Sequence, residues 1–248
     1  MTAARTHPSS STPRFPEIDL LRGIAAGCMI LFHAAFDLAF FGGQQWELNN
    51  GIIWLIGRSA AVLFVALAGV SMGLAWKRKH GEKTRPLLLR GIQIIGMGMV
   101  LTTFTWIFFP TYTIWFGVLH LIGAGILIGT CLLPYPRATL FAGIIGTIGG
   151  ITLSIIPTTI EALAIIPLFP AAFQTFDYFP LLPWMGVFFL GMSAGNYFFP
   201  SGRQRYQVSF DTQHPIARAL IWAGRNSLLL YFVHQPILVG IIMLLRIA

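Results

Sequence analysis

Long apolar runs separated by short polar or basic stretches dominate the chain. Each run comes close to the length of about 20 residues that an α-helix needs to cross a bilayer. Between Pro157 and Tyr178, prolines and acidic residues interrupt the apolar pattern and predict an interfacial or re-entrant loop instead. The seven predicted membrane spans cover about residues 18–41, 51–76, 87–109, 114–133, 138–156, 179–199 and 216–245.

The composition excludes a soluble globular domain. The 248 residues are 56% hydrophobic and only 10% charged, with a mean hydropathy of +0.74. A soluble domain carries about 25% charged residues, which cover its water-facing surface, and a disordered chain needs low hydrophobicity and high charge. We therefore expect an all-α, polytopic integral membrane bundle. Residues 17–248 would form one transmembrane domain after a disordered, Ser- and Pro-rich cytoplasmic tail of residues 1–16.

The basic residues are distributed unevenly, and this predicts the orientation. The net charge of +8 is explained by the enrichment of Lys and Arg in cytoplasmic loops, so we expect no nucleic-acid partner. With seven spans and a cytoplasmic N-terminus, fourteen of the sixteen basic residues fall inside, and only Arg58 and Arg246 fall outside. An eighth span over residues 158–173 would move the basic group of residues 203–225 outside. We expect a multi-pass protein of the inner or plasma membrane.

The first predicted span carries a pair of titratable groups in its outer half. His33 and Asp37 are four residues apart, so they are neighbours on one helix face, where the carboxylate can accept the imidazole proton and set its tautomer. Titratable groups inside a membrane are costly to bury and are functional candidates by default. We therefore predict a catalytic pair, with a structural hydrogen-bonded pair between packed helices as the alternative.

The same helix face connects this pair to the predicted cytoplasmic edge. Asp19 and Arg22 are three residues apart and can form an ion pair. Arg22 and His33 are separated by almost three turns, or about 16 Å along the helix axis. Two small residues between them, Ala25 and Ala26, predict a narrow passage along this face.

Two further titratable groups, Arg58 and His120, lie at a similar depth in the second and fourth predicted spans. Both could meet His33 and Asp37 at one level. For each, a structural role stays open, such as Arg58 acting as the charge partner of Asp37. Asp177 lies at the predicted outer interface, where capping of the sixth span is the favoured interpretation.

The last predicted span contributes His234. Ser227 shares a helix face with it, and Pro236 interrupts the helix hydrogen bonding one turn back, which could widen a cavity beside His234. Histidines on different spans can ligate a haem iron. A bis-histidine haem protein that uses His33, His120 and His234 is therefore one alternative, and a small-molecule transporter is another. Phosphate-binding loops and zinc-ligand spacings do not occur in the sequence.

Four short motifs occur in order along the chain. They are Glu17–Gly23 followed by His33, Gly117–His120 with Gly123, Phe176–Tyr178 with Pro183–Trp184 and Gly191, and Gly224 with Asn226–Ser227, Tyr231 and His234. Together they resemble the catalytic-domain family of heparan-α-glucosaminide N-acetyltransferase, in its compact prokaryotic branch, from Glu17 to about Val239. Because this chain is shorter than the lysosomal member, we expect a cell-envelope sugar rather than heparan sulfate as the acceptor.

The resemblance implies an acyltransferase that moves an acetyl group from cytosolic acetyl-CoA to a sugar amine or hydroxyl across the membrane, with a histidine as the chemical centre. No histidine lies between His33 and His80, so we assign His33 as the general base by its chemistry, with Asp37 orienting it. The expected partners are membrane lipid, acetyl-CoA and a glycan or amino-sugar acceptor. A homodimer stays open, and no metal is expected.

The other candidate residues receive supporting roles in this hypothesis. Residues expected to assist proton handling are His120 and His234. Residues expected to bind acetyl-CoA are Asp19, Arg22, Arg225, Asn226 and Ser227, together with the basic loop from Lys77 to Arg90. Residues expected to bind the acceptor are Arg58 and Asp177.

Overall fold

The computed structural model of the protein describes residues 15–43, 46, 48, 50–78, 84–155, 174–206 and 210–245. These residues form α-helices and short 3-10 helices and contain no strand, which confirms the predicted all-α class. The elements are α1 (Pro16–Phe40), α2 (Gly51–Arg78), α3 (Arg85–Phe108), η1 (Pro110–Tyr112), α4 (Val118–Leu132), α5 (Pro136–Leu153), α6 (Leu181–Phe198), η3 (Pro200–Gly202), α7 (Pro215–Arg225) and α8 (Ser227–Leu244).

Several helices are long and apolar enough to cross a bilayer. Within the described residues, five helices meet this condition by length and composition, namely α1, α2, α3, α5 and α8. Helix α4 is apolar but has only 15 residues, and α6 has 18 residues. The protein is therefore a polytopic helical membrane protein, and the total of seven spans stays a prediction. Most of the predicted interfacial loop, residues 156–173, lies outside the described residues.

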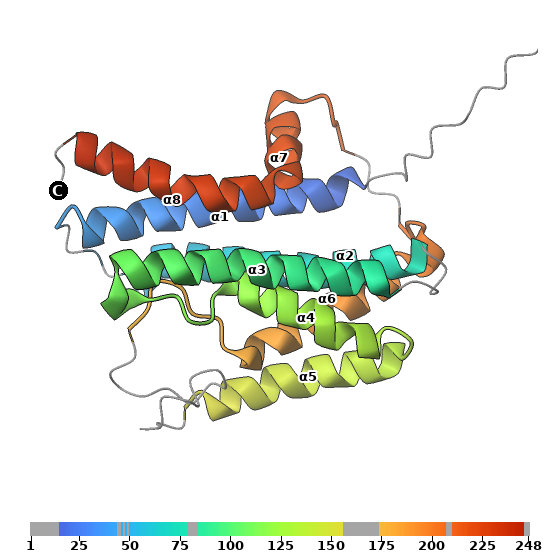
Figure 1. Cartoon of the computed structure of the whole chain (residues 1–248). Coiled ribbons are helices and arrows are strands. Elements are labelled where there is room, and N and C mark those ends of the chain that lie inside the picture. The colour runs from blue at the N-terminus through green and yellow to red at the C-terminus, as the bar shows by residue number, and fades with distance from the viewer. Residues whose placement is uncertain are drawn as a thin grey trace, which may run out of the picture.

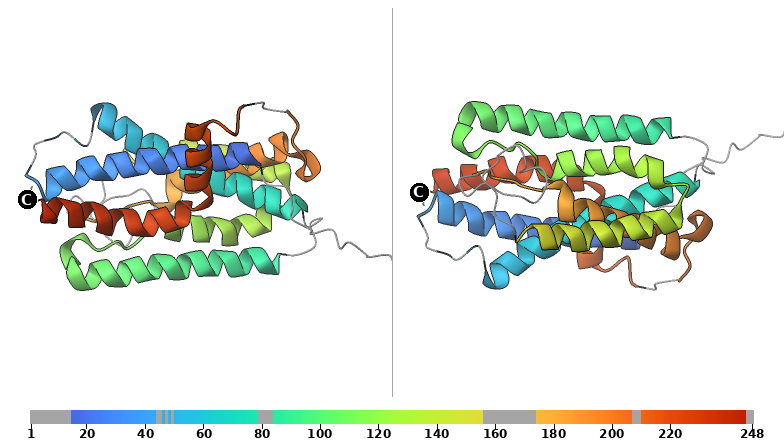
Figure 2. Two further views of the ribbon diagram at one scale, coloured as in Figure 1. Left: turned by 90° about the horizontal axis from the view of Figure 1, so that it is seen from above. Right: turned by 90° about the horizontal axis from the view of Figure 1, so that it is seen from below.

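The long helices share one direction, and one short helix crosses it. In Figure 1, α1, α2, α3, α5 and α8 run along a common axis, whereas α7 stands across it. Helix α1 begins at one end of the bundle and α8 ends at the other, as an odd number of crossings requires. Both views in Figure 2 place α1 beside α8 and put α3 at the edge of the bundle.

The last predicted span is wrong in its extent, because residues 216–245 form two helices rather than one. The break lies at Asn226, whose φ of −105° and ψ of 19° leave the helical region. Its side-chain Nδ2 donates to the carbonyl of Trp222 at 2.9 Å, a local bond of the kind that makes Asn unfavourable inside helices. The helix in line with the bundle is therefore α8 alone, and α7 is a separate amphipathic helix.

Two glycines allow α7 to cross α1 at backbone contact. A Cβ atom at Gly224 would lie 1.7 Å from the carbonyl oxygen of Asp19, and one at Gly23 would lie 1.9 Å from that of Leu220. No side chain fits at such distances, so the crossing depends on both glycines. This crossing places Arg225, the residue after Gly224, next to the acidic side chain of Asp19.

The apolar core lies where α2, α4 and α6 meet. Val65, Leu121, Phe188 and Met192 have no exposed surface there. Glycine again brings backbones together, because a Cβ at Gly69 would lie 2.1 Å from the carbonyl oxygen of Phe188. The core therefore holds α2, α4 and α6 together, while the titratable groups of α1 and α8 lie beside it.

Candidate active site

Two histidines from opposite ends of the sequence meet between α1 and α8. The imidazole rings of His33 and His234 are in edge-to-face contact, with 4.8 Å between their centroids and 66° between their planes. His234 is buried, with 7% of its surface exposed, and His33 is half-buried. The two imidazoles therefore lie together beside the C-terminal half of α1, which the sequence predicts to lie in the outer half of the membrane.

Backbone carbonyls set the tautomers of both imidazoles. His33 Nδ1 lies 2.9 Å from the carbonyl oxygen of Met29, and His234 Nδ1 lies 2.9 Å from that of Leu230. A carbonyl oxygen only accepts hydrogen bonds, so each Nδ1 carries the proton and donates it. Each Nε2 is then left with a free lone pair. The Nε2 of His234 is buried without a hydrogen-bond partner among the described residues.

The predicted pairing of Asp37 with His33 is wrong. Asp37 is completely buried, and its Oδ1 accepts a hydrogen bond of 2.9 Å from Nε2 of Gln235 on α8. No hydrogen bond joins Asp37 to His33 within the described part of the chain. The reason is that Nδ1 of His33 donates to the backbone carbonyl of Met29 on its own helix. The carboxylate of Asp37 instead accepts a hydrogen bond from the side-chain amide of Gln235 on α8. Gln235 is thus a site residue that the sequence interpretation missed.

Asp177 caps a helix, but not the helix expected. Its Oδ2 accepts hydrogen bonds from the backbone N–H of Val118 at 3.0 Å and from the hydroxyl of Tyr231 at 3.3 Å. It therefore caps α4 and ties the start of α4 to α8, rather than capping the sixth predicted span. Burial raises the pKa of Asp177 to about 6, although the two donors oppose this shift.

His120 lies apart from the histidine pair. Its Nδ1 accepts a hydrogen bond of 3.3 Å from the backbone N–H of Gly117, and its Nε2 lies 3.4 Å from the hydroxyl oxygen of Thr102. That hydroxyl donates to the carbonyl of Ile114 at 2.6 Å, so it accepts the Nε2 proton. Both ring nitrogens are therefore used at the start of α4. No contact among the described residues joins His120 to His33 or His234.

Arg58 is also separate from the pair. Its guanidinium lies 5.7 Å from the ring centroid of Trp54 and 5.8 Å from that of Trp184, within cation–π range. The described residues provide no acidic partner for Arg58, so the alternative in which it neutralises Asp37 is wrong. Arg58 instead lies on the exposed side of α2, between two indoles.

Asp19 joins two arginines at the α1–α7 crossing. The predicted ion pair with Arg22 is confirmed, with Nη1 of Arg22 at 3.3 Å from Oδ1 of Asp19. Nε of Arg225 lies 3.3 Å from Oδ2 of the same carboxylate. Arg22 also donates to the hydroxyl of Ser71 on α2. Three helices thus meet in one polar cluster, in which two positive charges share one negative charge.

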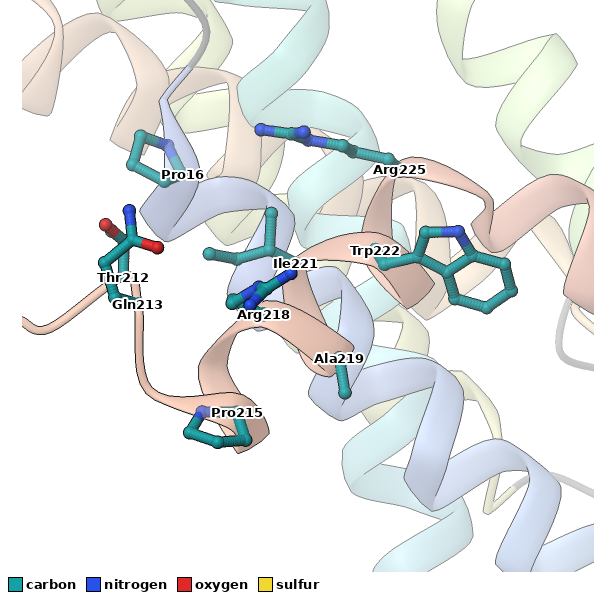
Figure 3. A pocket seen from close by; sticks show the side chains of 9 residues that line it. All are labelled: Pro16, Thr212, Gln213, Pro215, Arg218, Ala219, Ile221, Trp222 and Arg225. Atoms are coloured by element: carbon teal, nitrogen blue, oxygen red, sulfur yellow. The ribbon is translucent and has the colours of Figure 1, made fainter.

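A pocket of about 860 Å³ lies beside this cluster (Figure 3). Arg218 and Arg225 from α7 both border it, and Arg225 extends toward Pro16, whereas the indole of Trp222 points away. Arg218 makes no ion pair within the described residues. The sequence interpretation counted Arg218 among the cytoplasmic basic residues but did not assign it to the donor site. Its spacing of seven residues from Arg225, on one helix face, was the available signal.

The predicted passage along α1 is filled in the structure. Ala25 and Ala26 have no exposed surface, and Met29 retains only 7%. Helices α2, α7 and α8 all pack against α1, so the small residues serve close packing in this state of the protein. Asn226 and Ser227 form the junction between α7 and α8, and neither borders the pocket of Figure 3.

The site does not suit a haem. Two histidines that ligate one iron lie on opposite faces of a macrocycle, whereas the rings of His33 and His234 touch edge to face at 4.8 Å and leave no room for a macrocycle. His120 has both nitrogens hydrogen-bonded elsewhere. Among the described residues, no group of three or more His, Cys, Asp and Glu side chains is arranged to hold a metal ion.

Comparison with known proteins defines the class as a membrane-embedded acetyltransferase. Residues 14–236 match the family described as heparan-alpha-glucosaminide N-acetyltransferase, catalytic. The match covers most of the chain, so the protein belongs to this family, and the predicted resemblance to the family is confirmed. Searches of curated proteins and of solved structures find no match.

Proposed function

We propose that the protein transfers an acetyl group from acetyl-CoA to an amine or hydroxyl of a sugar substrate, with His33 as the general base. The supporting observation is the contact between His33 and His234, each with Nδ1 bound to a carbonyl and Nε2 free. An Nε2 held in this way can take a proton without reorienting. His33 is the better candidate for the base because its side chain is less buried.

The reaction needs one proton to move from the sugar to the leaving thiolate. The sugar N–H or O–H gives its proton to Nε2 of His33 as its nitrogen or oxygen attacks the thioester carbonyl. The new acetyl bond forms, the carbon–sulfur bond breaks, and CoA leaves with the electron pair. The imidazolium then returns the proton to the thiolate, giving the free thiol. General-base catalysis of this kind contributes about 10²- to 10⁴-fold in rate.

The pocket beside α7 is the proposed place for the nucleotide end of acetyl-CoA. Phosphates favour bidentate guanidinium partners, and Arg218 and Arg225 both border this pocket. Pro16, the first residue of α1, also lines the pocket. The charge distribution predicts that the end of the bundle where α1 begins is cytoplasmic. Because Arg22 and His33 are about 16 Å apart along α1, the acetyl arm must separate the packed helices near Ala25 and Ala26.

Transfer is expected to show sidedness in sealed right-side-out vesicles. Acetyl-CoA loaded inside should support acetylation of a sugar amine supplied outside, such as D-glucosamine. The reason is that the pocket beside α7, the proposed acetyl-CoA site, is expected to face the cytoplasm. The same donor supplied only outside should give less than about a tenth of this rate, since the CoA phosphates cross lipid poorly. Permeabilised vesicles serve as the control and should be active with donor on either side. Equal rates in sealed vesicles would contradict the route across the membrane.

Arg218→Glu is expected to raise the KM for acetyl-CoA by about 10- to 100-fold, the usual cost of losing a hydrogen bond to a charged group. The KM for the sugar should stay within about twofold, because Arg218 lies at the other end of the proposed route. Arg137→Glu, at the start of α5 and away from the pocket, is the matched control. If both variants raise the KM equally, general surface charge and not this pocket attracts the donor.

A further inference from the structure

A second contact between α1 and α8 lies one helical turn beyond the histidine pair. Asp37 follows His33 by four residues on α1, and Gln235 follows His234 directly on α8. The two side chains are joined by the 2.9 Å hydrogen bond from Gln235 Nε2 to Asp37 Oδ1. Asp37 has no exposed surface. His33, His234, Asp37 and Gln235 therefore form one four-residue cluster that links the two helices.

Each member of the cluster keeps one hydrogen-bond acceptor free. Oδ2 of Asp37, Oε1 of Gln235 and Nε2 of His234 are buried without a partner within the described residues. Nε2 of His33 carries a lone pair because its Nδ1 holds the proton donated to Met29, and it has no hydrogen-bond partner among the described residues. Buried polar atoms are nearly always hydrogen-bonded in folded proteins, and an unpaired one is costly. Four free acceptors, against a single remaining N–H of the Gln235 amide, indicate a ligand that supplies several O–H or N–H groups.

Within the described part of the chain, no positive charge balances the carboxylate of this cluster. The described ion pairs both involve Asp19, at the α1–α7 crossing. Arg58 rests against two indoles, and the described residues place no cation on Asp37. A carboxylate without a cation is stabilised most by strong hydrogen-bond donors. The chemistry of the cluster thus complements a polyhydroxylated or amino-bearing ring, and it does not complement a phosphate or a carboxylate.

We propose that Asp37 and Gln235 bind the sugar substrate directly and select it by its hydrogen-bond donors. Oδ2 of Asp37 and Oε1 of Gln235 would accept hydrogen bonds from groups next to the reacting one, so that the reacting amine or hydroxyl lies at Nε2 of His33. This inference rests on the proposed function and assigns Asp37 a new role. It contacts the substrate and does not orient His33, which is held by its own helix.

The test compares Asp37→Asn and Gln235→Met with the wild-type protein in steady-state kinetics. D-Glucosamine is the sugar probe and acetyl-CoA the donor. Both variants should raise the KM for glucosamine by about 10- to 100-fold, as expected for lost hydrogen bonds to a charged or buried group. The KM for acetyl-CoA should stay within about twofold. The matched control is Gln93→Met, at an exposed position outside the cluster, which should leave both KM values unchanged.

Thermal unfolding without substrates separates binding from a structural role. Asp37→Asn places an amide donor among free acceptors, so the melting temperature should stay the same or rise. A lower melting temperature with an unchanged KM for glucosamine would overturn the inference and make Asp37 and Gln235 structural. Unchanged KM values and stability would overturn it as well. If wild-type protein forms no acetylated glucosamine, the proposed sugar transfer itself fails, and that outcome is separate from the other two.

Discussion

His33→Ala is expected to lower kcat for acetyl transfer by about 10²- to 10⁴-fold, the usual contribution of a general base. His33 lies half-buried at the contact with His234 and uses only its Nδ1 within the protein, in the bond to Met29. Removing it therefore costs little packing, and we expect the melting temperature to change by only a few degrees. Both quantities should be measured on the same purified protein, so that activity is expressed per folded molecule.

His120→Ala is the matched control for this prediction. Its imidazole bridges Gly117 and Thr102 at the start of α4 and does not reach the pair. Its loss should lower stability, because the N–H of Gly117 is left without a partner, while activity per folded molecule stays near that of the wild type. If instead His120→Ala abolishes activity per folded molecule and His33→Ala lowers the melting temperature, His120 is catalytic and His33 structural. That outcome would contradict the assignment of His33 as the general base.

Gly224→Ala is expected to destabilise the protein by about 1–3 kcal/mol or more, the range for overpacking a close contact. The added Cβ would lie 1.7 Å from the carbonyl oxygen of Asp19. That atom belongs to the α1 backbone, so a side-chain rotation cannot relieve the clash, and α7 must move away from α1. Thermal unfolding in detergent measures the loss. The KM for acetyl-CoA should rise as well, because Arg218 and Arg225 are carried by α7.

Gly240→Ala provides the comparison for this second prediction. Among the described residues, no atom lies within 4 Å of a Cβ added at Gly240 apart from the neighbouring backbone of its own helix, and the residue lies in the last part of α8. A glycine replaced by alanine in an open helix position gains up to about 1 kcal/mol from lower backbone entropy in the unfolded chain. Its melting temperature should therefore stay the same or rise. Equal losses for both variants would show that the α1–α7 crossing tolerates a side chain.

The local periodicity of the sequence determined the helical class and the Asp19–Arg22 pair. Apolar runs of membrane-spanning length have few folded alternatives to a helix, because every backbone N–H and C=O must be satisfied in lipid. The three-residue spacing of Asp19 and Arg22 is a property of one helix turn, and the structure confirms the pair. The sequence also indicates His33 and His234 as candidates, because a titratable group within an apolar run is visible in the sequence.

Tertiary structure alone decided which of these groups meet. His33 contacts His234 because α8 lies beside α1, and Asp37 binds Gln235 for the same reason. The face of a single helix relates only residues of that helix. The sequence therefore predicts that Asp37 pairs with His33, and it cannot indicate Gln235 on α8. The pocket beside α7, the proposed acetyl-CoA site, also exists only because of helix packing. The break at Asn226 and the contact of Gly224 with Asp19 turn α7 across the bundle. Apolar residues on both sides of that break give a single run in the sequence. The local bond of Asn226 and the backbone contact of Gly224 with α1 together distinguish two helices from one.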